Sequence, residues 1–494
     1  MLYLGIDSGT QSTKVVVLDL ESGEILAQAA RSYDLIAGLP DGHLEQHPAD
    51  WTTALDDAIA ECLDHIGDRR SAVRGMGVSG QQHGLVVLDS RDEVVRPAKL
   101  WCDTSTTAQC AAFEENFGGT AGLIEKAGNA MLPGYTIPKL LWLKENEPEQ
   151  FARVATILLP HDYLNFHLTG VKRMEYGDAS GMGILNVRTR EWDQELIDFV
   201  DPRVSEMLPP LGSSNEVHGT LRPELADRWR LSSEVIVSAG GGDNMMGAIG
   251  TGNISNGIIT ASFGTSGTLY GCSEKPIIDP EGEIAAFCDS TDRWLPLACT
   301  MNVTVVTEQV RGWFGWSLEE LESAVSSVEA DASNLLFLPY LNGERTPNLP
   351  GASGVIHGLS GNQSSPAHLA RAAMEGATLG LAYGLRRFAS LGLEPSEIRL
   401  TGGGSKSATW RQISADAFGV PVVALATAEG ASLGGAIQAA FADGQGTYEE
   451  LCERLVALDE STRCLPQSDQ VDGYREKLDR QVELTQVLKD SGFL

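Results

Sequence analysis

The sequence predicts an α/β protein built from two domains of similar plan. Two glycine–threonine turns carry this prediction: residues 7–14 follow the apolar run 2–6, and residues 264–268 follow the apolar run 258–263. Each turn joins two strand-like runs, and strand pairs mixed with helices occur once in each half. A chain of 494 residues is too long for one core. We therefore expect domains at residues 1–245 and 246–494, with a cleft between them.

The first half reads as a strand meander followed by alternating helices and strands. Residues 2–29 alternate Val and Leu segments with turn residues, which predicts three strands. Apolar residues at helical spacing predict a helix over 49–66, and residues 105–155 are mostly helical and amphipathic. Further strands are expected at 73–78, 85–88 and 235–237.

The second half repeats this plan. A meander is expected near 258–298 and a strand at 398–400. Helices are expected at 303–328, 366–390, 406–418 and 431–442.

Composition excludes several classes of partner. The formal net charge of -31 opposes binding to nucleic acid or to an anionic membrane surface. The eight cysteines include no CxxC pair, so we expect free thiols in a reducing cytoplasm rather than a zinc site. No apolar run approaches the roughly 20 residues that span a bilayer. We expect a cytoplasmic protein without nucleic-acid or membrane partners; a homodimer is compatible with these features.

The first turn suits a phosphate group with a metal ion. Thr10, Ser12, Thr13 and Lys14 supply hydroxyl, amide and ammonium donors around a glycine that permits close approach. Asp7 ends the first predicted strand, where a carboxylate can hold Mg²⁺ through water. A turn-forming Asp is the alternative explanation.

The second half offers two matching segments. Gly264, Thr265 and Ser266 form the second turn, with the same donors as the first. Gly403, Gly404 and Ser405 follow the strand at 398–400 and open a helix, which leaves space for a flat base or a ribose. An ordinary capped helix start would explain the latter segment equally well.

Asp243 follows three glycines and precedes Asn244 at the expected domain junction. A carboxylate on such a turn can accept the proton of a hydroxyl group, as phosphoryl transfer requires. The alternative is a plain helix N-cap, a position that both residue types favour.

Polar and aromatic residues of the first half suit a polyol. Gln82 and His83 lie in a loop between predicted strands, and Trp101 and Asp103 offer an aromatic face beside a carboxylate. Lys139 lies on a predicted helix, where a solvated face is the ordinary expectation. Each feature alone is more often structural.

Together these residues resemble the FGGY family of carbohydrate kinases over nearly the whole chain. One family signature matches residues 134–146, and the other extends from residues 354–359 to 368–375. Within the family, the chain is most similar to the members that phosphorylate D-xylulose. The segments that support this are 82–84, 131–136, 159–164 and 338–347.

The resemblance implies a fold of two actin-like ATPase (ribonuclease H-like) domains that close on ATP, Mg²⁺ and a sugar. It implies that Asp243 is the catalytic base, with Asn244 beside it in the substrate site. It further implies an ATP and metal site at the first turn, with Asp7 as the metal residue. The second turn and the glycine segment complete the nucleotide site. The ketose site comprises Gln82, His83, Trp101 and Asp103.

Two departures from the family pattern lie near the sugar. Many bacterial relatives have Gln-Met-His where this chain has Gln81-Gln82-His83. Many also have an Arg shortly after the residue that matches Asp103. In this chain residues 104–110 contain no Arg, and this segment looks more like that of the eukaryotic members that phosphorylate D-xylulose.

The resemblance implies ATP-dependent phosphorylation of D-xylulose at O5. One alternative is the same chemistry on another ketopentose or pentitol, such as ribulose or arabinitol. A second is an actin-like assembly ATPase, which the Asp243 and Gln82-His83 segments oppose. A third, a silent sugar sensor, would require loss of Asp243 or of the phosphate turns, and all are present.

Overall fold

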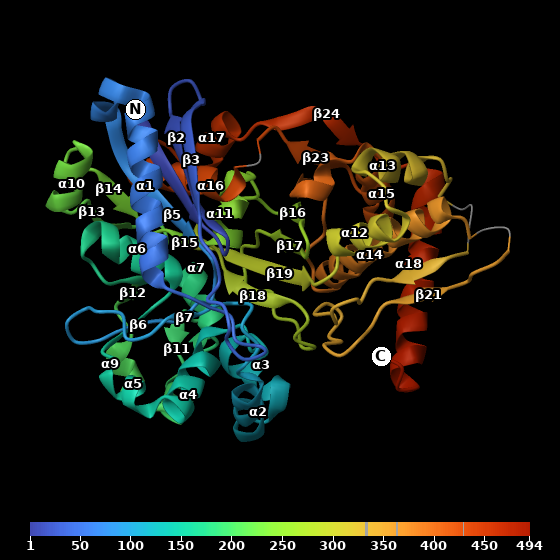
Figure 1. Cartoon of the computed structure of the whole chain (residues 1–494), viewed down its shortest axis with the longest axis horizontal. Coiled ribbons are helices and arrows are strands. Elements are labelled where there is room, and N and C mark those ends of the chain that lie inside the picture. The colour runs from blue at the N-terminus through green and yellow to red at the C-terminus, as the bar shows by residue number, and fades with distance from the viewer. Residues whose placement is uncertain (331–333, 362–363, 428) are drawn as a thin grey trace. The chain divides into compact units, whose positions relative to one another are not determined.

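The computed structural model describes residues 1–330, 334–361, 364–427 and 429–494 (Figure 1). Two compact units, each with its own mixed β-sheet, confirm the predicted α/β class. Each unit is assembled from three segments. The first unit comprises Met1–Ile254, Ser273–Leu295 and Glu429–Val456; the second comprises Ser255–Cys272, Pro296–Ala428 and Ala457–Leu494.

The sheet of the first unit has the strand order β13-β14-β5-β1-β2-β3, with the short strand β15 beside β5. Strands β1, β2 and β3 form the predicted antiparallel meander, whereas β5 and β14 continue the sheet in parallel with β1. The bounds are β1 (Leu2–Ser8), β2 (Ser12–Asp19), β3 (Ile25–Ser32), β5 (Val73–Gly80), β13 (Val217–Thr220), β14 (Ile236–Ser238) and β15 (Gly241–Gly242).

Helices cover both faces of this sheet because the buried side chains of β1 alternate between the faces. Leu2, Leu4 and Ile6 belong to a core that includes residues of α1 (Pro48–Ile66), α6 (Pro160–Thr169) and α10 (Pro223–Trp229). Tyr3 belongs to a second core with α11 (Asp243–Gly250), α16 (Gly430–Ala442) and α17 (Tyr448–Leu455).

Helix α16 lies directly against the backbone of the sheet. A β-carbon at Gly5 would overlap the carbonyl oxygen of Ser432, and one at Gly77 would overlap that of Gly435. Glycine is therefore required on both central strands by close approach rather than by backbone conformation.

The second unit contains most of β19 and all of β17, β16, β22, β23 and β24, which are neighbours in that order. Strand β16 pairs antiparallel with β17 and parallel with β22, and α14 is the long helix of this unit. The strands are β16 (Ile258–Phe263), β17 (Gly267–Gly271), β19 (Trp294–Thr300), β22 (Glu397–Thr401), β23 (Val422–Leu425) and β24 (Leu458–Cys464); the helices are α12 (Thr304–Phe314), α13 (Leu318–Ser326), α14 (Pro366–Ser390), α15 (Ala408–Phe418) and α18 (Ser468–Asp490).

The two sheets repeat one topology, as the paired turns predicted. The orders β3-β2-β1-β5-β14-β13 and β19-β17-β16-β22-β23-β24 correspond strand by strand. In both, a three-strand antiparallel meander is followed by two parallel strands and an antiparallel edge strand.

Two local features differ from the sequence prediction. The helix expected at 431–442 is α16, which belongs to the first unit although it lies late in the chain. The helix expected at 406–418 is divided into a 3₁₀ turn, Gly403–Lys406, and α15. A Ser407 cap in extended conformation starts α15, and its hydroxyl accepts from the Trp410 N–H.

Smaller elements complete the chain. They are β4 (Glu45–Gln46), β6 (Val86–Leu88), β7 (Ala98–Lys99), α2 (Thr107–Asn116), α3 (Gly119–Ala127), α4 (Thr136–Asn146), α5 (Pro148–Arg153), β8 (Thr156–Leu158), β9 (Met174–Glu175), α7 (Tyr176–Ala179), β10 (Leu185–Asn186), β11 (Glu191–Trp192), α8 (Gln194–Val200), α9 (Val204–Met207), β12 (Leu211–Gly212), β18 (Ala285–Cys288), β20 (Leu336–Leu338) and β21 (Val355–His357), with 3₁₀ turns Gly67–Ala72 and Ser180–Met182.

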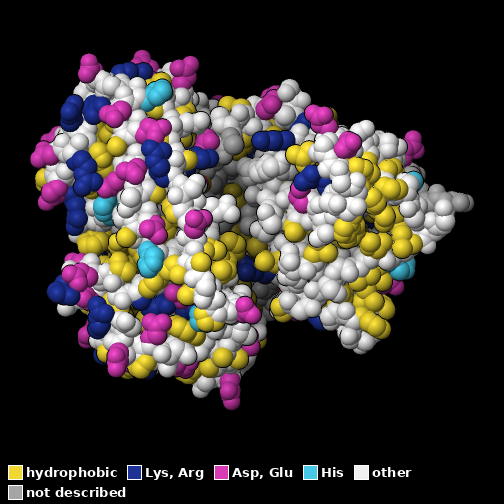
Figure 2. Space-filling model, in the orientation of Figure 1, with side chains coloured by type: hydrophobic (Ala, Val, Ile, Leu, Met, Phe, Trp, Pro, Cys, Tyr) yellow, Lys and Arg dark blue, Asp and Glu magenta, His cyan; other side chains and the backbone are white. Residues whose placement is uncertain are grey.

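The surface carries charges of both signs. On the face drawn in Figure 2, Asp and Glu side chains are interspersed with Lys and Arg. Among the residues described, none of the helices combines the length and apolar character needed to cross a lipid bilayer.

Candidate active site

Strand pairing in the first unit gathers three segments that the sequence singled out. Ser8 at the end of β1 lies opposite Gly80 of β5, and Gly242 of β15 lies opposite Gly80 on its other side. The N–H of Gln81 donates to the Ser8 carbonyl at 2.9 Å. The first phosphate turn, the Gln82–His83 loop and Asp243 therefore leave the sheet at one edge.

Asp243 is the first residue of α11. The N-cap is Gly242, without a side-chain cap bond, so Asp243 does not serve as the plain helix cap considered above. Its Oδ1 accepts from the backbone N–H of Asn244 at 2.8 Å and from Asn244 Nδ2 at 2.9 Å. Burial and the negative charges of Asp7 and Asp178 raise the pKa of Asp243 to about 7. A carboxyl group with this pKa can accept a proton at neutral pH.

Gln82 connects this carboxylate to the loop after β5. Its side chain is 5% exposed, and its Oε1 accepts from Asn244 Nδ2 at 2.8 Å. Its Nε2 is buried without a hydrogen-bond partner among the described residues. An unsatisfied buried donor costs about 1–3 kcal/mol, so a ligand oxygen at this position would be favourable.

His83 occupies a conformation that is uncommon for a side-chain-bearing residue. Its φ is 64°, in the left-handed region. Its carbonyl accepts from Lys139 Nζ at 2.8 Å, and its N–H donates to the Asp178 carboxylate. The imidazole packs against the rings of Tyr135 and Phe287, with centroids 5.0 and 5.5 Å away.

Lys139 does not face solvent, contrary to the expectation for its helix. The side chain is fully buried in α4 and donates to the carbonyls of His83 and Gly134, the latter at 2.5 Å. Burial lowers the pKa of Lys139 to about 7. The helical pattern did not reveal this because a lysine can satisfy backbone carbonyls inside a core.

Asp7, the residue predicted to hold a metal ion, lies near the end of β1. Ser79 Oγ donates to its Oδ1 at 3.1 Å, yet burial raises the pKa of Asp7 above its ordinary value. The negative charge of Asp7 also raises the pKa of Asp243. The two carboxylates therefore repel each other, and their negative charges are only partly compensated. Lys14 lowers the pKa of Asp7, but its ammonium pairs with Glu429 at 3.0 Å. A divalent cation fits this donor set.

The first glycine–threonine turn and Trp101 are directly connected by hydrogen bonds. Trp101 Nε1 donates to Thr10 Oγ1 at 2.9 Å, and Gln46 Nε2 donates to the Thr10 carbonyl at 2.6 Å. Thr13 is buried and its hydroxyl donates to Ser8 Oγ at 3.0 Å, whereas Ser12 is partly exposed. Thr10 and Ser12 are thus better placed to meet a ligand than Thr13.

Asp103 lies in a different environment from Gln82 and Asp243. It is fully buried, and its carboxylate accepts from Lys99 Nζ at 3.0 Å, from the Leu44 N–H at 2.9 Å, and from the backbone and hydroxyl of Ser105. Burial acts against ionisation, but these donors lower the pKa of Asp103 below its ordinary value. Its contact with a sugar remains a prediction.

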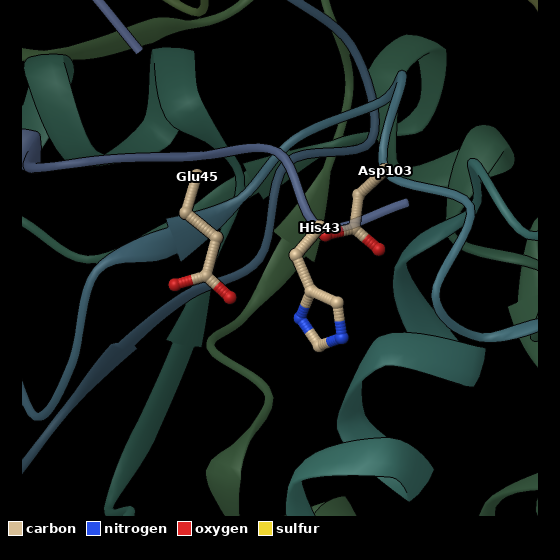
Figure 3. A group of neighbouring side chains, drawn as sticks. All are labelled: His43, Glu45 and Asp103. Atoms are coloured by element: carbon tan, nitrogen blue, oxygen red, sulfur yellow. The ribbon is translucent and has the colours of Figure 1, made fainter. Parts of the chain in front are cut away.

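Asp103 is also part of a group with metal-ligand character. Figure 3 shows His43, Glu45 and Asp103 around a common point, where one ligand atom from each lies within 4.8 Å of the others. Lys99 Nζ reaches the same three groups, at 3.2 Å from His43 Nδ1, 3.1 Å from Glu45 Oε1 and 3.0 Å from Asp103 Oδ2. The lysine ammonium therefore supplies the positive charge that a metal would otherwise bring.

The second unit brings its two predicted nucleotide segments together. Strands β16 and β22 pair with Ser262 opposite Thr401, so the second turn and the glycine segment follow adjacent strand ends. The Gly264 carbonyl accepts from the N–H of Thr304, the first residue of α12, and the Thr265 carbonyl accepts from the N–H of Val303, both at 3.0 Å. A β-carbon at Gly404 would lie 2.9 Å from Phe263 Cβ, and Ser405 Oγ donates to the Gly402 carbonyl at 2.7 Å.

Comparison with known proteins identifies the family. The model for the N-terminal domain of the FGGY family of carbohydrate kinases matches residues 2–250, and that for the C-terminal domain matches residues 259–442. The chain belongs to the FGGY family of carbohydrate kinases. This confirms the resemblance seen in the two signatures, and a kinase family implies the use of ATP.

The relatives of this FGGY kinase cover it from end to end. The xylulose kinase of Haemophilus influenzae is 44% identical over 97% of this chain and 98% of its own. The crystal structure of a "xyloylose kinase" from Brucella ovis, 30% identical, superposes with a TM-score of 0.93 over 99% of this chain and 100% of that one. The crystal structure of a gluconate kinase from Lactobacillus acidophilus, 27% identical, superposes with a TM-score of 0.92 over 99% of this chain and 98% of that one.

Sequence reasoning about this FGGY kinase missed a buried ionic group beneath the His83 loop. His161 lies 2.8 Å from Asp178 Oδ2 through Nδ1 and 3.0 Å from Asp162 Oδ1 through Nε2. Burial opposes its charge, but the two carboxylates raise the pKa of His161 well above its ordinary value. The segment 159–164 supported the family resemblance, but nothing in its pattern indicated that His161 meets Asp178.

Proposed function

We propose that this FGGY kinase transfers the γ-phosphoryl group of ATP to O5 of D-xylulose, giving D-xylulose 5-phosphate and ADP. The observation that carries the proposal is the hydrogen-bonded group of Asp243, Asn244 and Gln82, in which the Gln82 amide has an unused buried donor. The H. influenzae relative named xylulose kinase supports the choice of sugar.

In this proposal, Asp243 accepts the proton of the sugar hydroxyl as its oxygen forms the new bond to phosphorus. The bond between the γ-phosphorus and the bridging oxygen breaks, and ADP leaves with the electron pair. Asn244 holds Asp243 Oδ1 through two hydrogen bonds, so the other carboxylate oxygen remains for the substrate. Gln82 and His83 orient the sugar.

Asp7 would hold Mg²⁺ in this site. The ion neutralises phosphate charge when it is bound, and Lys14 adds a cation at the same turn. In the second unit, Gly264, Thr265 and Ser266 would contact phosphate oxygens, and Gly403, Gly404 and Ser405 would contact the adenosine. The glycine segment suits a flat group because, among the described residues, a β-carbon built at Gly403 would meet no heavy atom within 4 Å beyond its chain neighbours and the backbone of its own turn.

A second candidate substrate is an aldonic acid, because a gluconate kinase superposes closely. A substrate carboxylate requires a cation near the sugar loop. Lys139, which contacts His83, already donates to two carbonyl oxygens. The geometry therefore favours a neutral ketose.

The test is a panel of D-xylulose, D-ribulose, L-ribulose, D-arabinitol and D-gluconate with coupled ADP detection. We expect the highest kcat/KM for D-xylulose, with ³¹P NMR of the product showing a phosphate ester at C5. A higher kcat/KM for gluconate, or ADP release that no sugar stimulates, would overturn the proposal.

A further inference from the structure

His83 is held through its backbone as well as through its ring. A residue with a β-carbon and φ of 64° is in a strained conformation that persists only when its surroundings fix it. Both polar groups of its backbone are engaged by buried side chains. These contacts are distinct from the sugar-facing role proposed for the imidazole.

The two sides of His83 are bound by a carboxyl group on one side and an amine and a hydroxyl on the other. The N–H donates to the carboxylate of Asp178, and the carbonyl accepts from Lys139 Nζ at 2.8 Å and from Thr136 Oγ1 at 3.1 Å. Asp178, Lys139 and Thr136 are 0%, 0% and 1% exposed. Hydrogen bonds to charged groups away from water are among the stronger ones in proteins.

The surroundings leave little room for another conformation. A β-carbon at Gly181 would overlap the imidazole of His83, and one at Gly84 would lie 2.5 Å from Pro160 Cγ. The imidazole packs on Tyr135 and Phe287. A shift of the backbone would therefore move the ring into occupied space or away from its aromatic neighbours.

We infer that Asp178, Lys139 and Thr136 form a clamp on the His83 peptide, and that these positioning residues determine how strictly the enzyme selects its sugar. The inference rests on the proposed function because His83 is taken as a sugar contact. A site that hydrogen-bonds a particular hydroxyl rejects its epimer only if the contacting group cannot move to follow it. The clamp supplies that rigidity.

The main test compares Lys139→Met with Lys144→Met. Both lysines lie on α4, and both donate to a backbone carbonyl, but Lys144 is 40% exposed and binds Val200 rather than the loop. We expect Lys139→Met to raise the KM for D-xylulose about tenfold and to lower its preference over D-ribulose at least fivefold, with the ATP KM within twofold. Lys144→Met should change neither value.

Thr136→Val provides an isosteric second test, which also serves if Lys139→Met does not fold. It removes one donor to the His83 carbonyl and should raise the sugar KM two- to threefold. Gly181→Ala displaces the ring without altering the clamp and should lower the sugar preference as Lys139→Met does. An unchanged preference in folded Lys139→Met, or in Thr136→Val and Gly181→Ala together, would overturn the inference.

A readout without substrate separates this inference from the proposed function. The Cε1–H signal of His83, one of 9 histidines, can be assigned by its loss in His83→Ala. We expect this signal to shift and broaden in Lys139→Met and to stay in place in Lys144→Met. Failure of the wild type to phosphorylate D-xylulose would refute the proposed function alone, whereas an unmoved signal in Lys139→Met would refute the clamp.

Discussion

Lys14 Nζ and Glu429 Oε2 form an ion pair at 3.0 Å, although 415 residues separate them in the chain. Lys14 lies on β2 and is the last residue of the first phosphate turn, and Glu429 directly precedes α16. The pair therefore ties the turn to the helix that covers the sheet. Glu429 therefore pairs with the same cation that the proposal assigns to phosphate.

Glu429→Gln should strengthen the binding of ATP. Removing the competing carboxylate leaves the Lys14 ammonium available, and pairs of this exposure are worth about 0.2–1 kcal/mol. We expect the ATP KM to fall up to about fivefold with the sugar KM unchanged, whereas Lys14→Ala should raise the ATP KM and lower kcat. Steady-state kinetics with each substrate varied will check this; a rise in ATP KM in Glu429→Gln would contradict it.

Asp243→Ala should abolish most turnover and leave nucleotide binding intact. The carboxylate is the proposed proton acceptor, and such groups contribute about 10²–10⁴-fold in rate. Asp227→Ala, at an exposed position of α10, is the matched control and should retain full activity. Retention of more than a tenth of kcat in Asp243→Ala, or loss of ATP binding by calorimetry, would show that the role is misassigned.

Activity should decline at acidic pH. The pKa of Asp243 is raised to about 7, and only its ionised form accepts a proton. Activity is therefore full above this pKa and falls about tenfold per pH unit below it. A bound divalent cation favours the carboxylate and should move the midpoint lower as Mg²⁺ rises. Sugar kcat/KM from pH 5 to 9 at two Mg²⁺ concentrations measures this; a flat profile down to pH 5 would argue against Asp243.

Lys99→Met should destabilise the fold strongly. It leaves the buried carboxylate of Asp103 without its ammonium, whereas Glu45 keeps its ion pair with Arg96 at 2.8 Å; breaking a buried pair typically costs 3–5 kcal/mol. Lys126→Met, which removes a partly exposed lysine that pairs with Glu195, should cost under about 1 kcal/mol. Urea unfolding will measure both.

Zn²⁺ or Mn²⁺ should not raise the Tm of the wild type, because the Lys99 ammonium already lies among His43, Glu45 and Asp103. A metal-dependent rise in Tm that Asp103→Asn removes would show a metal site at the Lys99 position.

Gly77→Ala should also be destabilising, because its β-carbon would overlap the backbone of α16. Overpacking against an immovable backbone typically costs 1–3 kcal/mol or more. Gly312→Ala is the control, since among the described residues the added carbon would meet no heavy atom within 4 Å beyond its chain neighbours and the nearby backbone of α12. Equal unfolding free energies for the two variants would contradict the close packing of α16.

Much of the fold could be predicted because its signals are local. Alternating apolar residues and a turn at 21–23 specified the β1–β3 meander, and helical spacing specified α1 and α14 almost to the residue. The membership of α16 was not predictable, since its contacts with Gly5 and Gly77 join segments far apart in the chain. Small residues such as Gly434 and Gly435 indicate close packing but do not identify the partner.

The candidate site, like the fold, could be predicted from the sequence only in part. Glycine-rich turns after predicted strands identified Asp7, Gly264 and Asp243 as candidates, because the residues that form a turn are adjacent in the sequence. The buried partners of His83 were missed: Lys139 reads as a surface residue of a helix, and Asp178 carries no local signal. Their roles depend on which side chains meet in the core, and one sequence does not contain that information.

The return of residues 429–456 to the first unit has a consequence for synthesis. Until these residues leave the ribosome, one face of the first sheet, with Tyr3 and Leu18, lacks α16 and α17. The first unit therefore cannot finish folding before most of the second has been translated, unlike a chain whose domains mature in sequence. A fragment that ends at Ile254 would expose that face, whereas a permuted chain that begins near Glu429 would deliver the covering helices first.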